Sequence, residues 1–154
     1  MPLNTKLIAH LCLAGLLFCF SLKGKQTNVD SLLTATEVLP NDSLKCEKYL
    51  ALSLELYDGE TAIEVGLKAL TVAKQLNSIT LKGKAYNALG WVTSSRNMEQ
   101  KSAYIDSAVA MFSILNDLQG LGIAYNTKGA VLLEFGNFAE AEDALRKALA
   151  YMIE

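Results

Sequence analysis

The chain has 154 residues, of which 51% are hydrophobic, and this is enough to bury a substantial core in a single domain. Its 14 basic residues do not outnumber its 16 acidic ones, and the net charge at pH 7 is −2. A protein that binds nucleic acid needs clustered lysine and arginine to neutralise phosphates. The composition therefore argues against a nucleic-acid partner.

The first apolar stretch has the layout of a secretory signal peptide. It covers residues 7–22, between Lys6 and Lys23, and a short basic start before an apolar stretch is typical of such signals. At sixteen residues it is shorter than the roughly 20 needed to span a bilayer. We therefore expect a cleaved signal over residues 1–25 and export to the periplasm or cell envelope, with membrane attachment only if the segment is retained. Cleavage removes three basic residues and no acidic ones, which changes the net charge from −2 to −5.

After residue 28 the apolar residues recur three or four positions apart, the spacing of amphipathic helices. We therefore predict an all-α protein whose leader, residues 26–42, holds a short helix near 29–39 that ends at Pro40. Six longer helices are expected to follow, over residues 43–57, 60–76, 79–95, 98–116, 118–135 and 138–154. Because the connections between them are only a few residues long, each helix is expected to fold back on its predecessor as an antiparallel pair.

The expected helix starts carry capping residues. Ser78 and Asp117 are candidate N-caps, since their side-chain oxygens can accept from a free backbone N–H of the first turn. Asn97 and Asn137, each followed three residues later by Gln or Glu, resemble capping boxes. Glycines mark the turns inside the first and third pairs, where a positive φ is useful.

A stretch of fifteen residues is repeated later in the chain. Residues 76–90 align with residues 115–129, with seven identical positions, and the candidate caps Ser78 and Asp117 align with each other. The identical residues of the first copy are Leu76, Asn77, Gly83, Ala85, Tyr86, Asn87 and Gly90. Self-similarity at a period of a few tens of residues is typical of stacked repeats, in which each unit buries its apolar face against its neighbours. Such proteins present a surface, so the repeat favours a binding function.

The second copy continues into a pattern that resembles the tetratricopeptide repeat. A large aromatic lies four residues before a glycine, and small and large apolar residues follow at fixed offsets. The residues that carry the pattern are Tyr125, Gly129, Ala141, Leu145 and Ala148. In that family small residues let two helices approach closely and large ones fill the facing gaps.

The resemblance covers about residues 43–154 as roughly three helix pairs, and it implies an α-solenoid with a right-handed superhelical twist. Two features depart from the family pattern. The period of about 40 residues is longer than the roughly 34 of that pattern, and the closing proline is missing.

Lengthened repeats behind a signal peptide are similar to those of exported bacterial tetratricopeptide proteins. The resemblance implies a non-catalytic scaffold that binds a protein or peptide. Two alternatives stay open. One is a truncated sensory region of a signalling protein with a histidine-kinase or DNA-binding output, and the other is a membrane-tethered assembly scaffold.

The sequence offers little for catalysis, and we expect no enzyme activity, no cofactor and no metal site. His10 is the single histidine and lies in the expected signal peptide, so that no imidazole would remain for acid–base chemistry or metal binding. Cys46 is the one cysteine beyond that segment, and its expected role is that of a small buried hydrophobe. The acidic residues at positions 140, 142 and 143 are explained by a helix N-terminus, which favours negative charge.

In tetratricopeptide proteins the concave face of the first helices commonly meets the ligand, and the resemblance carries this face onto two repeats. The candidate binding residues are Asn87, Trp91, Ser94 and Ser95 in the middle repeat, and Asn126, Ala130, Leu133 and Glu134 in the last. On this interpretation the two asparagines hydrogen-bond the backbone of an extended peptide, and Trp91 supplies an apolar anchor. The alternative is that Trp91 packs between helices and the asparagines make local hydrogen bonds.

The last expected helix ends in a largely apolar run, from Ala148 to Ile153. A stack of repeats needs a polar face on its final helix. We therefore expect either that the chain is part of a longer protein or that a partner or a second copy packs on this helix.

Overall fold

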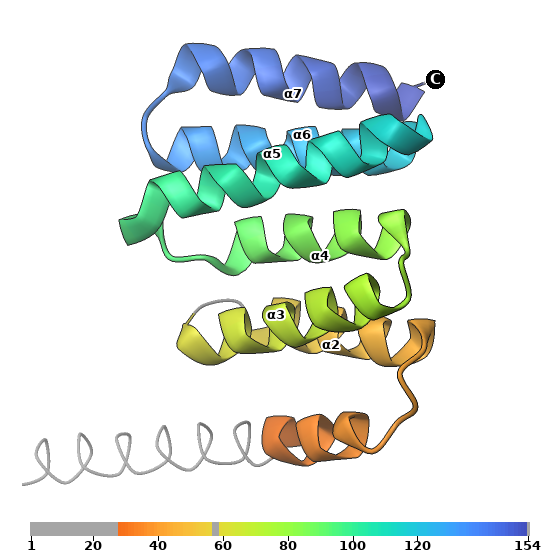
Figure 1. Cartoon of the computed structure of the whole chain (residues 1–154). Coiled ribbons are helices and arrows are strands. Elements are labelled where there is room, and N and C mark those ends of the chain that lie inside the picture. Colours follow the sequence, from red (N-terminus) through yellow and green to blue (C-terminus); the bar gives the residue numbers. More distant parts are fainter. Residues whose placement is uncertain (1–27, 57–58, 154) are drawn as a thin grey trace, which may run out of the picture. The chain divides into compact units, whose positions relative to one another are not determined.

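The computed structural model describes residues 28–56 and 59–153, and the regular elements in these residues are all helices (Figure 1). The all-α prediction is therefore confirmed. The chain divides into two units, of which the structure describes residues 28–38 of the first and residues 39–56 and 59–153 of the second. The expected signal peptide, residues 1–25, lies outside the described residues.

The described part of the first unit is a helix over residues 28–37. Two threonine hydroxyls donate to carbonyls one turn earlier, Thr34 to Asp30 at 2.9 Å and Thr36 to Leu32 at 2.8 Å. The helix ends before Pro40, as predicted, since a proline disfavours helical geometry in the residue that precedes it.

The second unit is built from consecutive α-helices. They are α2 (Ser43–Leu56), α3 (Glu60–Gln75), α4 (Ile79–Val92), α5 (Met98–Leu115), α6 (Leu118–Glu134) and α7 (Phe138–Ile153). All of these starts are as predicted, and the ends agree within one residue except for that of α4. The most extensive packing joins α2 to α3, α4 to α5 and α6 to α7. Next, α4 packs on α3 and α6 on α5, and the first helices α2, α4 and α6 are in contact in turn.

The repeated segment that begins at Leu76 and Leu115 opens with a helix stop followed by a helix start. Asn77 and Asn116 both have a φ of 51°, in the left-handed region that asparagine tolerates better than most residues. In both cases this N–H and the next one bond back to carbonyls of the last helical turn, which closes the helix as a Schellman motif. Ser78 and Asp117 then accept from first-turn N–H groups of α4 and α6, at 3.3 Å and 2.9 Å. The two predicted N-caps are thus confirmed.

Two glycines of α4 let α5 approach closely. Gly83 faces the ring of Phe112, and Gly90 faces Ile105. A β-carbon added to these glycines would lie 2.8 Å and 2.4 Å from those side chains, closer than a real contact allows. The earlier glycine meets the later residue of α5, so the two helices run antiparallel.

The same arrangement recurs between α6 and α7. Gly122 faces Met152 and Gly129 faces Leu145, and added β-carbons would lie 2.9 Å and 2.6 Å from those side chains. In the repeated segment these glycines align with Gly83 and Gly90. The close helix contacts expected from Gly90 and Gly129 are therefore present. The glycines of the repeated segment recur because both helix pairs need them for close packing.

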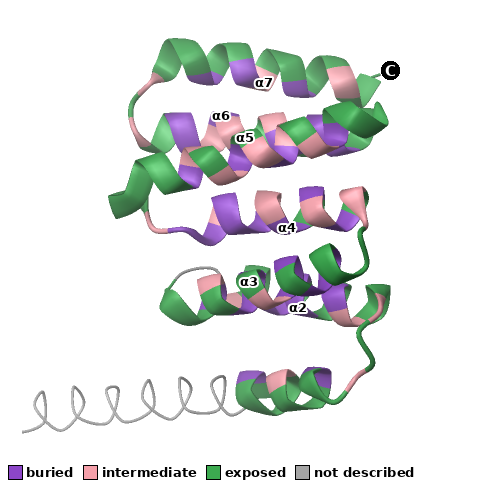
Figure 2. Ribbon diagram, in the orientation of Figure 1, coloured by how far each residue is buried: buried purple, intermediate pink, exposed green. Residues whose placement is uncertain are grey.

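Buried residues occur in each of the helices α2 to α7 (Figure 2). The largest fully buried side chains include Leu89 of α4, Ile105 of α5 and Val65 of α3. Cys46 is also fully buried, with its Sγ 3.3 Å from the Ala69 carbonyl oxygen, and burial raises the pKa of its thiol. The prediction of a buried Cys46 is confirmed.

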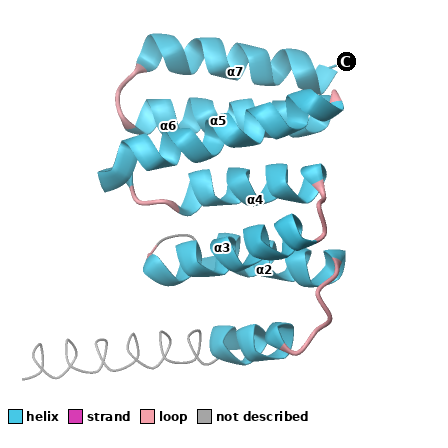
Figure 3. Cartoon of the chain, in the orientation of Figure 1, coloured by secondary structure: helices cyan, strands magenta, loops and turns pink. Residues whose placement is uncertain are grey.

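The helix α4 is shorter than predicted, ending at Val92 instead of residue 95. Thr93 and Ser94 have extended ψ values of 133° and 141°, and a short 3-10 helix, η1 (Ser95–Asn97), precedes α5. The link is drawn as a loop after α4 in Figure 3. The Thr93 hydroxyl donates to the Leu89 carbonyl at 2.6 Å, at the point where the backbone ceases to be helical.

The predicted capping box at Asn97 is only half present. Its Oδ1 accepts from the Gln100 backbone N–H at 3.2 Å, and its amide group donates to the Gln100 side chain at 2.8 Å. In a complete box the Gln100 side chain would instead accept from the backbone N–H of Asn97. That N–H bonds to the Ser94 carbonyl at 2.9 Å, because η1 brings this carbonyl within reach.

Candidate functional site

The larger of two hollows beside α4 is bordered by the three first helices, and we call it the three-helix hollow. Its volume is about 480 Å³, within the range of ligand sites in proteins. Its walls include Leu50 and Leu54 of α2, Lys84 and Asn87 of α4, and Gln119 and Ile123 of α6. The hollow thus lies on the helices that the sequence predicted to line a groove.

Asn87 differs from the other polar residues because its side-chain oxygen is buried and has no hydrogen-bond partner. Within the described residues it is the one buried side-chain oxygen or nitrogen in this condition. An unpaired buried acceptor costs about 1–3 kcal/mol, and most such groups find a partner in a folded protein. The free protein therefore leaves the hydrogen bonding of Asn87 incomplete at the wall of the hollow.

Each charged residue around the three-helix hollow is already engaged in a contact. Lys84 of α4 pairs with Glu47 of α2 at 3.6 Å, and both side chains are about half exposed. Asp117, also at the wall, has its carboxylate engaged as the cap of α6. Exposed ion pairs contribute at most about 1 kcal/mol. Shape and hydrogen bonds, rather than net charge, distinguish this surface.

The smaller hollow lies beside the C-terminal ends of α4 and α6, and we call it the Trp91 hollow. Its volume is about 270 Å³. Its walls include Trp91, Ser94, Ser95, Lys101, Ala130 and Glu134. Apart from Lys101, these are residues that the sequence predicted for a binding face, so the fold brings candidates from two repeats together.

Lys101 is the residue of this hollow that sequence reasoning missed. It comes from α5, is only 5% exposed, and its Nζ donates to Glu134 Oε2 at 3.0 Å. The hydrogen bond from Lys101 holds the pKa of the Glu134 carboxyl below its ordinary value, with a smaller contribution from Ser95, although partial burial acts in the opposite direction. The family resemblance concerns first helices, so it carries no signal for a side chain from a second helix.

Removing the Glu134 carboxylate is expected to destabilise the protein more than removing the charge of Lys101. Glu134→Ala leaves a buried ammonium without its partner, and we expect the free energy of unfolding to fall by about 1–3 kcal/mol. Lys101→Met keeps the buried stem and removes the charge, so we expect a change of less than about 1 kcal/mol. Urea unfolding at pH 7 measures both variants, and equal losses would contradict this assignment.

Acid unfolding gives a second measurement of the same pair. The pKa of Glu134 is lowered in the folded protein from its ordinary value of 4.5, so the folded state binds fewer protons than the unfolded state. The resulting stability is present above pH 4.5 and is lost as the pH falls through the lowered pKa. Lys101→Met should therefore lose less stability than the wild type over this acidic range.

Asn126 and Leu133 line neither hollow, although the sequence predicted them for the same face. Both are exposed on α6. Asn126 corresponds to Asn87 one repeat later, but α4 has a first helix on each side, α2 and α6. In the described residues α6 contacts a first helix on one side alone, which leaves Asn126 open.

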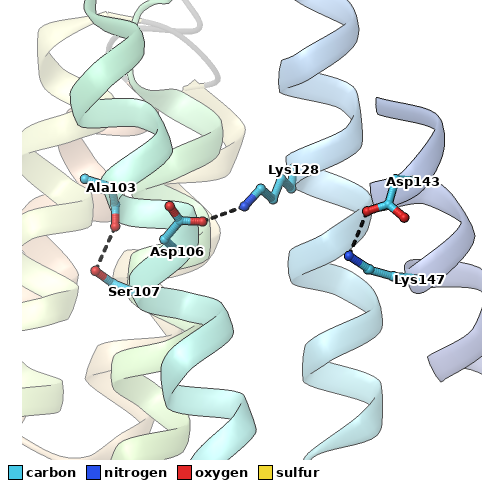
Figure 4. Close-up of polar contacts among 6 residues, drawn as sticks. All are labelled: Ala103, Asp106, Ser107, Lys128, Asp143 and Lys147. Carbon is cyan, nitrogen blue, oxygen red and sulfur yellow. Dashed lines mark hydrogen bonds and ion pairs between the residues drawn. The ribbon is translucent and has the colours of Figure 1, made fainter. Parts of the chain in front are cut away.

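Charged residues on the surface of α5, α6 and α7 pair with each other. Lys128 of α6 reaches Asp106 of α5 at 2.7 Å, and Lys147 of α7 reaches Asp143 of the same helix at 2.7 Å (Figure 4). These exposed pairs contribute little to stability. Near the start of α7, Glu142 and Asp143 thus pair with Arg146 and Lys147 of the same helix. In residues 28–56 and 59–153, no group of three or more His, Cys, Asp or Glu side chains is placed to bind a metal ion.

Comparison of the chain with protein-family models, with curated proteins and with solved structures finds no match. None of the helices described above combines the length and the apolar character that crossing a membrane requires. The function is therefore inferred from the two hollows and the residues that form them.

Proposed function

We propose that the protein is an exported, non-catalytic scaffold of the tetratricopeptide type, a right-handed solenoid of helix pairs that binds a protein or peptide. The ligand lies as an extended segment along the first helices α2, α4 and α6, and no cofactor or metal takes part. Recognition rests on shape and main-chain hydrogen bonds, because the lysines of both hollows, Lys84 and Lys101, are already paired with carboxylates.

The observation that carries this proposal is the incomplete hydrogen bonding of Asn87 in the three-helix hollow. An asparagine amide has both donors and an acceptor, so once its side chain turns to bring the buried oxygen to the hollow it can exchange hydrogen bonds with the N–H and C=O of one peptide unit. Leu50, Leu54 and Ile123 at the same walls offer apolar contact to the side chains of such a segment. Main-chain hydrogen bonds beside apolar pockets are a recurrent way of binding extended peptides.

The packing of the second unit supports the family assignment. Inside each of two successive pairs, α4 with α5 and α6 with α7, the helices approach over glycines at aligned positions of the repeated segment, which is what the small and large positions of the tetratricopeptide pattern imply. The contacts of α2 with α4 and of α4 with α6 also fit a stack in which the first helices form one continuous face.

Peptide selection tests the proposal. The full chain is immobilised and used to enrich peptides from a phage-displayed library of short random sequences, and calorimetry measures the affinity of each enriched peptide. We expect enriched peptides that bind along the first helices and whose affinity depends little on salt, because the groove is close to neutral.

Asn87→Leu is expected to separate binding from stability. Removing the unpaired oxygen should raise the free energy of unfolding by about 1 kcal/mol, whereas the loss of hydrogen bonds to the ligand should weaken peptide binding about tenfold. Asn126→Leu is the matched control, since it changes the corresponding but exposed asparagine and should alter neither quantity much. A selected peptide that binds Asn87→Leu as tightly as the wild type would rule out the role proposed for Asn87.

A further inference from the structure

A third hollow lies between α6 and α7, and we call it the Tyr125 hollow. Its volume is about 460 Å³, and its walls include Tyr125 and Leu132 of α6 and Ala144 of α7. Tyr125 comes two residues after Ile123, which lines the three-helix hollow, and residues at this spacing lie on nearly opposite faces of a helix. The Tyr125 hollow is therefore separate from the three-helix hollow, and its properties do not depend on peptide binding there.

Positions of α5 and α7 can be matched through the glycines that they face. Gly90 of α4 faces Ile105, and the aligned glycine of α6, Gly129, faces Leu145. The two facing residues are forty positions apart in the chain, from 105 to 145. Each residue of α5 thus corresponds to the residue of α7 that lies forty positions later.

In the earlier helix pair a tyrosine fills the place that corresponds to the hollow. Tyr104, the counterpart of Ala144, stacks on Tyr86 with ring centres 6.3 Å apart, and its hydroxyl accepts from the side-chain amide of Gln100 at 3.2 Å. Tyr86 aligns with Tyr125 in the repeated segment. Because alanine stands where the earlier pair has tyrosine, the later pair has a hollow where the earlier pair has a ring.

The walls of the hollow retain both kinds of group that hold the ring in the earlier pair. Tyr125 supplies an aromatic surface, and its own stacking partner, Tyr151, with ring centres 5.7 Å apart, lies about two turns of α7 beyond Ala144. Glu140 at the wall is the counterpart of Gln100. Its carboxylate can accept a hydrogen bond from a phenol hydroxyl.

The cations at the rim are paired within the protein. Lys128 reaches Asp106, and Lys147 reaches Asp143 (Figure 4), so the hollow does not call for a charged ligand. The Nζ of Lys147 lies 5.8 Å from the centre of the Tyr125 ring, near the outer limit of a cation–π contact. Since the Lys147 side chain is about half exposed, it can move aside as a ring enters.

We infer that the Tyr125 hollow binds the phenol ring of a tyrosine carried by a polypeptide ligand. Small-molecule sites enclose most of their ligand, whereas Ala139, Glu140 and Lys147 at the wall of this hollow are exposed. The hollow therefore accepts a ring and leaves its carrier outside. A second copy of the chain is a poor source, because each tyrosine in residues 28–56 and 59–153 is buried or stacks on another tyrosine.

An NMR titration of the ¹⁵N-labelled full chain tests this inference. The probe is N-acetyltyrosinamide, a neutral substitute for a tyrosine within a peptide. We expect shift changes centred on Tyr125, Leu132 and Ala144 and a Kd on the order of 1 mM, as one ring and one hydrogen bond provide. N-acetylphenylalaninamide lacks the hydroxyl and should bind roughly three- to tenfold more weakly.

Four variants link the binding to the hollow. Ala144→Tyr places a ring where Tyr104 has one, so it should abolish the shift changes without lowering the Tm. Tyr104→Ala opens the corresponding place in the earlier pair and should add a second set of shift changes around Tyr86. Glu140→Ala should remove the preference for the tyrosine probe, whereas Glu142→Ala, at an exposed position of the same helix, should keep it.

Four results would overturn the inference. One is the absence of shift changes at Tyr125 and Ala144 in an excess of the tyrosine probe. Another is equal affinity of the wild type for the two probes, which makes the ligand any aromatic ring instead of a tyrosine. Tighter binding of free tyrosine than of the amide makes the ligand a free amino acid. Shifts of these residues that depend on protein concentration, without a probe, make a second copy the occupant.

Discussion

Phe112→Ala is expected to lower the free energy of unfolding by about 3–5 kcal/mol. The ring is almost fully buried in a cluster with Ala108 and Leu121, and it lies between Gly83 of α4 and Gly120 of α6. On the sides of α4 and α6 that face the ring the neighbours are glycines, which have no side chain to move into the space that the ring leaves. The cavity should therefore stay largely open, and the loss should fall toward the upper part of this range. Urea unfolding followed by circular dichroism measures it.

Met152→Ala is the matched control for this variant. Met152 occupies the corresponding position on α7 but is mostly exposed, so its truncation should cost less than about 1 kcal/mol. Similar losses for the two variants would contradict the contrast between the covered face of α5 and the open face of α7.

Gly90→Leu is expected to destabilise the protein by about 1–3 kcal/mol. Even a β-carbon at this position would lie 2.4 Å from Cγ1 of Ile105, an atom close to the backbone whose position is set by the stiff χ1 of a β-branched side chain in a helix. The helices α4 and α5 must therefore separate. Replacing a helical glycine normally stabilises a protein by about 0.5–1 kcal/mol through backbone entropy. The expected net loss means that the steric cost at Ile105 exceeds this gain.

Gly129→Leu should have a similar effect between α6 and α7, where a β-carbon would lie 2.6 Å from Cγ of Leu145. Ala110→Leu provides the control, since it adds bulk at an exposed position of α5 and should change stability by less than about 0.5 kcal/mol. If thermal unfolding showed no change for either glycine variant, the helices would not depend on these glycines for their approach.

Helix starts could be read from the sequence because the signal is local. Ser78 and Asp117 cap with their own side chains, and the asparagines before them end the preceding helices, so the repeated segment contains its own boundary. The end of α4 could not be read in this way. Residues 93–95 have helical spacing, and their departure depends on η1 and on the hydrogen bond from Thr93 to Leu89.

Site residues that share one face of a helix could be predicted from the sequence. Features that depend on which helices pack beside that face could not. The family resemblance implied that Trp91, Ala130 and Glu134 lie on the binding face of the first helices, and they do line one hollow. The different settings of Asn87 and Asn126 arise because α2 packs on α4, a contact that identical local sequences do not reveal. Lys101 enters from α5, which the family resemblance did not consider.

Hydrogen–deuterium exchange of the full chain, with and without a peptide selected from the library, tests the proposed binding face most directly. We predict that the peptide slows exchange in α2, α4 and α6, most strongly around Leu50, Asn87 and Ile123, which line the three-helix hollow. Slower exchange confined to α7, or spread over segments outside the first helices, would contradict peptide binding along this face.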